Sequence, residues 1–149
     1  DTLRSGWLTT GPKTRRFEQA FVDFLGDASL EAIAVNSATA GLHLALEAAG
    51  VGPGDEVILP VYTFVASYNV VVLNYALPIL IDTDIETFQI DTKKMEQAIT
   101  PQTKLLMPVH IGGSPADIDT ILAIGRKHNL PVIEDACQAH LAEWKGKKV

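Results

Sequence analysis

A run of small residues, Asn36–Gly41, has the composition of an anion-binding turn. It stands between an apolar run and a segment with helical periodicity, so it is expected to open a helix. The first N–H groups of a helix have no partners inside it, and together with the helix dipole they favour an anion such as phosphate. The Thr39 hydroxyl can add a hydrogen bond. An ordinary N-cap with small side chains for packing has the same composition, so both interpretations stay open from this stretch alone.

A carboxylate ends a second apolar run. Asp135 follows Val132–Glu134, and a carboxylate at this position can pair with the cationic ring nitrogen of an aromatic ligand. Keeping that nitrogen protonated turns the ring into an electron sink. Gln138 can reach the same ligand or cap the turn. A solvated Asp at a strand end is the alternative for Asp135.

An aromatic residue follows another apolar run. Phe64 ends Pro60–Phe64, where its ring can stack on a planar ligand, although aromatic residues more often belong to a core.

The other candidate residues carry less chemistry. Asp82 and Asp84 are paired carboxylates of the kind that can hold a divalent cation, but no third ligand is near, which favours a turn. His43 lies in a helical segment and is interpreted as structural, whereas His110 ends a strand and can line a site. Cys137 has no signature of a nucleophile and is interpreted as a small buried residue.

The elements that position these residues alternate between strands and helices. Short apolar runs predict strands at Glu31–Val35, Glu56–Pro60, Pro78–Asp82, Lys104–Val109 and Pro131–Asp135. Helical patterns cover a segment from Pro12 to Gly26, then Ala38–Ala49, Phe64–Tyr75, Thr92–Ile99 with Asp91 as N-cap, and Asp117–His128. A hairpin is expected at Leu141–Val149, turning at Lys145-Gly146. The alternation predicts an α/β fold with a mostly parallel sheet and helices on both faces.

The carboxyl ends of parallel strands are where ligands bind in open sheets of this type. We therefore expect Ser37, Phe64 and Asp135 to lie around one pocket.

Composition narrows the function classes. The 149 residues are 47% hydrophobic and 20% charged, as in a globular protein, and the net charge is −6. No basic block except the one at Lys145–Lys148 is present, which argues against nucleic acid and anionic membranes as main partners. The apolar runs are too short to cross a bilayer, and no signal peptide opens the chain. A single cysteine fits a reducing cytoplasm.

Several segments together resemble the DegT-type aminotransferases, which are fold-type-I pyridoxal-phosphate enzymes that aminate keto-sugars attached to nucleotides. The matching motifs occur in the family's order and spacing from nearly one end of the chain to the other. They are Gly6–Pro12, Ser37–His43, Gly52–Ile58, Thr63–Ser67, Pro108–His110 with Pro115–Asp117, and Ile133–His140.

The resemblance implies a specific cofactor, pyridoxal 5'-phosphate, and a role for several residues. Ala38 and Thr39 would hold its phosphate, and Phe64 would cover one face of the pyridine ring. Asp135 would pair with the ring nitrogen, and Gln138 would lie near the ring hydroxyl.

The resemblance also implies that residues 1–149 are an incomplete, amino-terminal part of the cofactor-binding large domain. The family's Schiff-base lysine would lie beyond Val149, and the small carboxyl-terminal domain would be absent. Lys145–Lys148 lie in the expected hairpin and do not include that lysine. Trp7 and Thr10 would help line the sugar pocket.

The activity implied is transfer of an amino group, usually from glutamate, to a ketone carbon of a nucleotide-linked sugar, in a cytoplasmic homodimer of polysaccharide biosynthesis. A dehydratase of the same family, which uses the amine form of the cofactor and a histidine in place of the lysine, is the first alternative. A non-catalytic regulatory half-domain is the second. The residue that separates them is expected beyond Val149.

Overall fold

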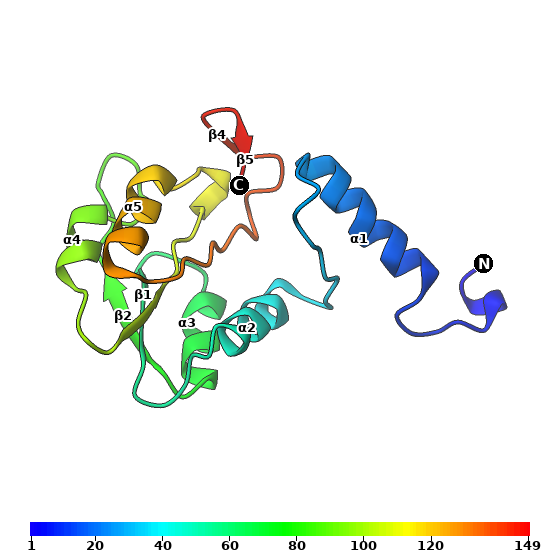
Figure 1. Ribbon diagram of the computed structural model, residues 1–149, viewed down its shortest axis with the longest axis horizontal. Helices are drawn as coiled ribbons and strands as arrows, with labels where there is room; N and C mark the ends of the chain where they lie inside the picture. Colours follow the sequence, from blue (N-terminus) through cyan, green and yellow to red (C-terminus); the bar gives the residue numbers. More distant parts are fainter. The chain divides into compact units, whose positions relative to one another are not determined.

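A computed structural model describes all residues, 1–149, which form two compact units. Residues Asp1–Asn36 make an amino-terminal unit and residues Ser37–Val149 make a sheet unit. The amino-terminal unit contains a short 3-10 turn and one α-helix, and all the other helices and the strands lie in the sheet unit (Figure 1).

The amino-terminal unit consists of one long helix with extended flanks. A short 3-10 turn, η1 (Leu3–Ser5), precedes α1 (Pro12–Leu25). Pro12 suits the first helical position because its missing N–H would be unpaired there, and Gly26 ends the helix with a φ of 77°. The predicted helix and its glycine stop are thus confirmed.

The strand predicted at Glu31–Val35 is wrong. These residues pair with no strand, and the side chain of Ile33 is 80% exposed. A strand needs a ladder partner, and this segment belongs to the amino-terminal unit, which has no sheet. Its backbone is held at one point, where the Ala34 N–H donates to the Glu18 carboxylate over 2.9 Å.

The sheet unit has a parallel, three-stranded sheet in the order β2-β1-β3. Its elements in chain order are α2 (Ala38–Ala48), β1 (Glu56–Pro60), α3 (Val65–Leu73), β2 (Leu77–Ile81), α4 (Thr92–Gln97), β3 (Thr103–Leu106), η2 (Ile111–Gly113), α5 (Ile118–His128), β4 (Glu143–Trp144) and β5 (Lys147–Lys148). Most predicted elements are confirmed within a few residues, including the Asp91 cap, whose carboxylate accepts from two N–H groups of α4.

Two faces of the sheet are covered by different helices, which makes three layers (Figure 1). Val57 and Leu59 of β1 pack with α2 and α3, while Ile58 between them packs with α4 and α5. Side chains alternate across a strand, so a run that is apolar at every position must be buried on both faces. The continuous apolar pattern of β1 therefore reflects its central place in the sheet.

The strand predicted at Pro131–Asp135 is present only as two isolated parallel bridges, Leu106↔Val132 and Val109↔Asp135. They extend the sheet beyond β3 and bring Asp135 beside the residues that follow β3. The predicted hairpin is confirmed: β4 and β5 are antiparallel and join through Lys145-Gly146, both with positive φ.

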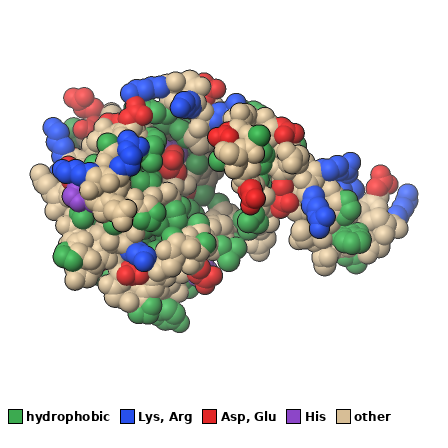
Figure 2. Space-filling view, viewed as in Figure 1, with side chains coloured by type: hydrophobic (Ala, Val, Ile, Leu, Met, Phe, Trp, Pro, Cys, Tyr) green, Lys and Arg blue, Asp and Glu red, His purple; other side chains and the backbone are tan.

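The surface mixes charged and hydrophobic side chains (Figure 2). Among the latter are Val72 and Leu73 of α3, which are 45% and 56% exposed, although Val70 and Val71 of the same helix are fully buried. The helix α3 is therefore apolar on its outer face as well as its inner one. No helix in residues 1–149 combines the length and the apolar character needed to cross a bilayer.

A first prediction tests the central strand. Ile58→Ala should lower the free energy of unfolding by roughly 2–5 kcal/mol, because Ile58 is fully buried and the deletion leaves a cavity between β1 and the α4–α5 layer. Urea unfolding followed by circular dichroism measures the change. The matched control is Ile85→Ala at a position that is 86% exposed, which should change stability by less than about 0.5 kcal/mol. Equal effects of the two substitutions would contradict the layered core.

Candidate functional site

A cavity of about 160 Å³ opens at the carboxyl ends of the strands in the sheet unit. Residues far apart in sequence line it: Ala38, Thr39, Leu42, Thr63, Phe64, Ala66, Ser67, Val109, Ile111, Asp135, Cys137 and Gln138. The cavity therefore lies at the edge of the sheet where we expected a ligand to bind. The predicted site residues Ala38, Thr39, Phe64, Asp135 and Gln138 all lie around this one cavity, and Ser37 adjoins it as the cap of α2.

One wall of the cavity is the amino end of α2. Ser37 is the N-cap, and its hydroxyl accepts from the Ala40 N–H over 3.1 Å. The Gly41 N–H donates to the Ser37 carbonyl. The N–H groups of Ala38 and Thr39 precede the first helical bonds, so they remain available to an anion at the mouth of the cavity.

Asp135 also lines the cavity and is only 5% exposed. Its backbone is fixed on both sides: its N–H donates to the Pro108 carbonyl over 2.9 Å, and its carbonyl accepts from the His110 N–H over 3.0 Å. The segment after β3 thus fixes the backbone that carries this carboxylate.

Donors reach both oxygens of the Asp135 carboxylate. The Ser67 hydroxyl of α3 donates to Oδ2 over 2.7 Å, and the Cys137 N–H donates to Oδ1 over 3.2 Å. The Thr63 hydroxyl lies 2.8 Å from the Ser67 hydroxyl. Nothing in the sequence analysis assigned a function to Ser67 or Thr63, and both line the cavity.

The interpretation of Cys137 as a buried residue is wrong: the residue is exposed as a whole and borders the cavity. Its thiol is nevertheless partly withdrawn from water and hydrogen-bonded to Asp135. Desolvation first, and the Asp135 carboxylate second, raise the pKa of the Cys137 thiol to about 12. The thiol therefore stays protonated at neutral pH.

Gln138 is oriented by a glycine turn. Its Oε1 accepts from the Gly112 N–H over 2.8 Å, which leaves the side-chain NH₂ as the group free to donate elsewhere. The turn residue Gly113 has a φ of 82°, and a Cβ there would lie 3.0 Å from the Gln138 carbonyl oxygen. A side chain at this position would therefore be strained, which accounts for glycine in η2.

Phe64 caps α3 and stands at the rim of the cavity. Its side chain is 68% exposed, so it is not the core residue that an aromatic usually is. An exposed ring beside a cavity is free to cover a flat ligand.

The expectation that His110 lines the site is wrong. His110 is fully buried and does not line the cavity, whereas its neighbours Val109 and Ile111 do. The Ala116 N–H donates to Nδ1 over 3.0 Å, which places the ring proton on Nε2, 3.0 Å from the Glu134 carboxylate. His110 thus joins the η2 loop to the segment that carries Asp135.

The acidic pair at 82–84 forms a turn, as favoured. The Asp84 carboxylate accepts from the N–H groups of Glu86 and Thr87, and these bonds lower its pKa, the bond to Thr87 most. Asp82 pairs with Lys94 over 3.0 Å. His43 lies within α2 and pairs with Glu47 one turn on, as a structural residue would.

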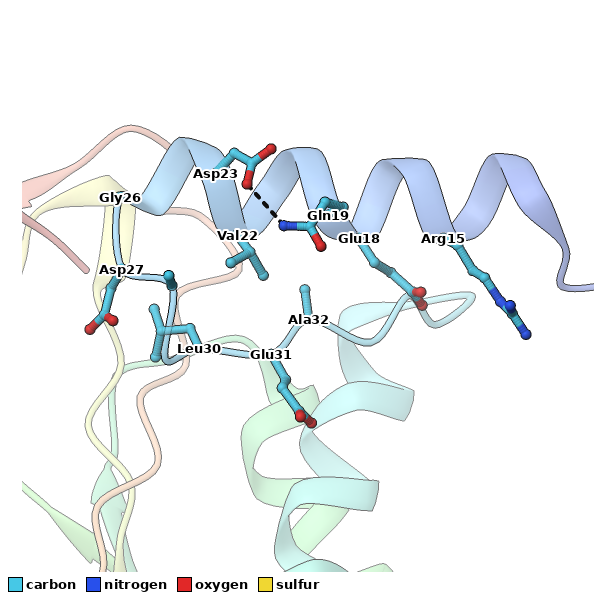
Figure 3. A pocket seen from close by; sticks show the side chains of 11 residues that line it. Arg15, Glu18, Gln19, Val22, Asp23, Gly26, Asp27, Leu30, Glu31 and Ala32 are labelled. Atoms are coloured by element: carbon cyan, nitrogen blue, oxygen red, sulfur yellow. Dashed lines mark hydrogen bonds between the residues drawn. The ribbon is translucent and has the colours of Figure 1, made fainter.

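A second cavity belongs to the amino-terminal unit and is larger, about 560 Å³. Figure 3 shows acidic side chains around it, with Gln19 donating to Asp23 over 2.9 Å. The single cation among its lining residues is Arg15. Four carboxylates, from Glu18, Asp23, Asp27 and Glu31, disfavour an anionic ligand, so size does not make this cavity the better site.

Trp7 and Thr10, predicted near a substrate, also lie in the amino-terminal unit. The Trp7 indole N–H donates to the Thr10 carbonyl over 2.9 Å, and the Trp7 side chain is 55% exposed. Trp7 and Thr10 are therefore hydrogen-bonded to each other at an exposed place in the amino-terminal unit.

Comparison with known proteins gives one consistent result. The model of the DegT/DnrJ/EryC1/StrS aminotransferase family matches residues 1–149. Among solved structures, DesV of S. venezuelae is 38% identical with a TM-score of 0.96, over 99% of this chain and 39% of that one. NtdA from Bacillus subtilis, solved with bound cofactor PMP, is 40% identical with a TM-score of 0.89, over 94% of this chain and 32% of that one.

A third solved structure, a protein of Streptococcus pneumoniae assigned as a sugar aminotransferase and solved in its PLP form, is 36% identical with a TM-score of 0.92. The match covers 99% of this chain and 41% of that one. The chain thus spans about two fifths or less of the length of these relatives.

Proposed function

Since the chain belongs to the DegT/DnrJ/EryC1/StrS aminotransferase family, we propose that its complete gene product is a pyridoxal-phosphate-dependent aminotransferase. The proposed substrates are an amino donor, glutamate, and a keto-sugar linked to a nucleotide. The observation that carries this proposal is the single cavity where a helix amino end, an exposed aromatic ring and a buried carboxylate meet.

The residues present fit a phosphorylated pyridine. Free N–H groups at the start of α2 suit the phosphate. The Asp135 carboxylate is the acceptor that a protonated ring nitrogen needs, and it has room for one more donor. Its Oδ2 accepts from Ser67 and its Oδ1 from Cys137, while each carboxylate oxygen has two lone pairs.

These positions support a separate role for each residue toward the cofactor. Ala38 and Thr39 bind the phosphate, Phe64 covers one face of the ring and excludes water from it, and Gln138 donates its side-chain NH₂ to the ring hydroxyl. Asp135 holds the proton on the ring nitrogen. The bound cofactor supplies an electron sink for the carbanion formed at the amino-bearing carbon.

We also propose that residues 1–149 form the amino-terminal part of the cofactor-binding large domain, with Trp7 and Thr10 near the sugar. None of the residues that line the cavity is a lysine. Lys145 lies in the hairpin and pairs with Asp119. We place the lysine that attaches the cofactor outside residues 1–149.

A homodimer is the proposed assembly. The apolar outer face of α3, with Val72 and Leu73 about half exposed, supports a protein contact on this side of the sheet unit.

The test uses the complete gene product purified with pyridoxal phosphate. We expect glutamate to be converted to 2-oxoglutarate beyond one equivalent per bound cofactor only when a nucleotide-linked keto-sugar is present, with the sugar gaining one amino group by mass spectrometry. Borohydride reduction should label one lysine, and none of Lys145, Lys147 and Lys148 in stoichiometric amount. Water loss from the sugar without amination would identify a dehydratase. Cofactor binding without either reaction would identify a non-catalytic protein, and both results would overturn the proposal.

A further inference from the structure

Two hydrogen-bonded hydroxyl groups that line the cavity have no function in the proposal above. They belong to Thr63, at the end of the segment after β1, and Ser67, one turn into α3. Ser67 is a fully buried polar residue in a helix whose other buried residues are valines. A buried hydroxyl is costly unless it is paired, so its partners indicate why it is there.

The chemistry of the groups determines which hydroxyl donates in each of these two hydrogen bonds. An ionised carboxylate only accepts hydrogen bonds, so the Ser67 hydroxyl donates its single proton to Asp135 Oδ2, over 2.7 Å. The contact of 2.8 Å between the two hydroxyl oxygens then requires Thr63 as the donor. The order is Thr63 to Ser67 to Asp135, and each bond polarises the next toward the charge.

The carboxylate is consequently held against rotation from two sides. Ser67 holds Oδ2 from α3, and the Cys137 N–H holds Oδ1 from the segment after Asp135. Without Ser67, the only remaining restraint on the carboxylate plane would come from residue Cys137, two positions along the same segment. The α3 contact joins residues separated by 68 positions in the chain.

We propose that Ser67, supported by Thr63, is a positioning residue that orients the Asp135 carboxylate toward the ring nitrogen of the cofactor. Ser67 acts only through Asp135 and does not need to touch the ring. This inference rests on the proposed function, because it assumes that Asp135 faces a protonated ring nitrogen.

The experiment compares three variants of the complete gene product with the unaltered protein. Ser67→Ala removes the hydroxyl, Thr63→Val removes the second hydroxyl at nearly constant shape, and Ser67→Thr keeps the donor. A hydrogen bond to a charged group corresponds to roughly 10-fold to 150-fold, so kcat should fall by that factor in Ser67→Ala. KM for the amino donor should change by less than about threefold, since the lost interaction acts at the chemical step.

The other two variants show how the loss of kcat depends on each hydroxyl group. Thr63→Val should cost less than Ser67→Ala because Thr63 is one bond further from the carboxylate. Ser67→Thr should restore most of kcat. Affinity for pyridoxal phosphate, measured by equilibrium dialysis, is a readout independent of turnover, and Ser67→Ala should weaken it about threefold to 10-fold through the misplaced carboxylate. Urea midpoints identify any variant that is simply unfolded.

A double-mutant cycle separates positioning from other functions. If Ser67 acts through Asp135, Ser67→Ala should add almost nothing to the loss already caused by Asp135→Asn. Additive losses in the cycle would overturn the inference, as would unchanged kcat and cofactor affinity in Ser67→Ala. If Asp135→Asn alone has no effect, the proposed function fails, which is a different result from a large Asp135 effect without a Ser67 effect.

Discussion

Replacing Asp135 with Asn should lower the turnover of the complete gene product by more than about 100-fold. Asp135 is buried and lines the cavity, where the proposed cofactor's ring nitrogen requires an anionic partner. A neutral amide cannot keep that nitrogen protonated, so the electron sink is lost together with the ion pair.

The magnitude follows from two contributions. A hydrogen bond between charged groups contributes about 1.5–3 kcal/mol, which corresponds to roughly 10-fold to 150-fold in rate. The weaker electron sink adds to this in the transition state, so kcat should fall much more than the affinity for glutamate. Steady-state kinetics with a nucleotide-linked keto-sugar measures both quantities.

The control is Asp119→Asn. Asp119 is an exposed carboxylate of α5 that pairs with Lys145, and surface ion pairs contribute only about 0–1 kcal/mol. Turnover should be unchanged there. The urea midpoint must also be measured for Asp135→Asn, because the amide can accept from Ser67 or from the Cys137 N–H but presents a donor to the other. Near-normal turnover in a folded Asp135→Asn protein would show that Asp135 has a different function.

Most elements of the sheet unit could be predicted because their apolar runs and capping residues are features of the local sequence. The apolar run at Glu56–Pro60 is β1 to the residue, and Asp91 caps α4 as expected. The strand assigned to Glu31–Val35 fails because strand formation depends on a partner, which no local pattern records. Asp135 was found because it ends an apolar run, yet its segment makes only isolated bridges.

The supporting residues were missed for the same physical reason. Ser67 and Asp135 are 68 positions apart, and Gly112 and Gln138 are 26 apart, so their hydrogen bonds exist only in the folded chain. One signal was available for Ser67: a small polar residue among the valines of an apolar helix must find a partner if it is buried. Gly112 and Gly113 both have positive φ, and nothing in the local sequence identifies Gln138 as the partner of Gly112.

His110 shows that place in the chain does not predict which side chains enter a site. A residue that follows a strand lies near the site, but the direction of its side chain depends on the local backbone, and His110 is the N-cap of the η2 turn. Val109 and Ile111 line the cavity, whereas His110 is buried and binds Glu134 and Ala116.

The thiol of Cys137 should react slowly with iodoacetamide in the folded protein, although the residue is exposed. Desolvation and the Asp135 carboxylate raise its pKa from 9.0 to about 12, and the thiolate is the reactive form. Below pH 9 the thiolate fraction is then roughly 1,000-fold lower than in an unfolded chain. A more basic thiolate is a better nucleophile, which returns a factor of about 20 to 30, so the net rate should be roughly 30-fold to 50-fold lower.

The dependence on pH provides the sharper test, because a raised pKa moves the whole titration. Since the thiol remains protonated, the alkylation rate should rise about tenfold per pH unit and show no plateau by pH 10, whereas the same cysteine in urea should level off near its ordinary pKa. Cys137 is the only cysteine, so mass spectrometry of a single adduct follows it directly. Asp135→Asn removes the second cause of the shift but not desolvation, so its alkylation should be faster than in the unaltered protein and still slower than in urea. Rapid labelling of the folded protein at pH 8, with a plateau near pH 9, would mean that the thiol is neither withdrawn from water nor in contact with Asp135 as described.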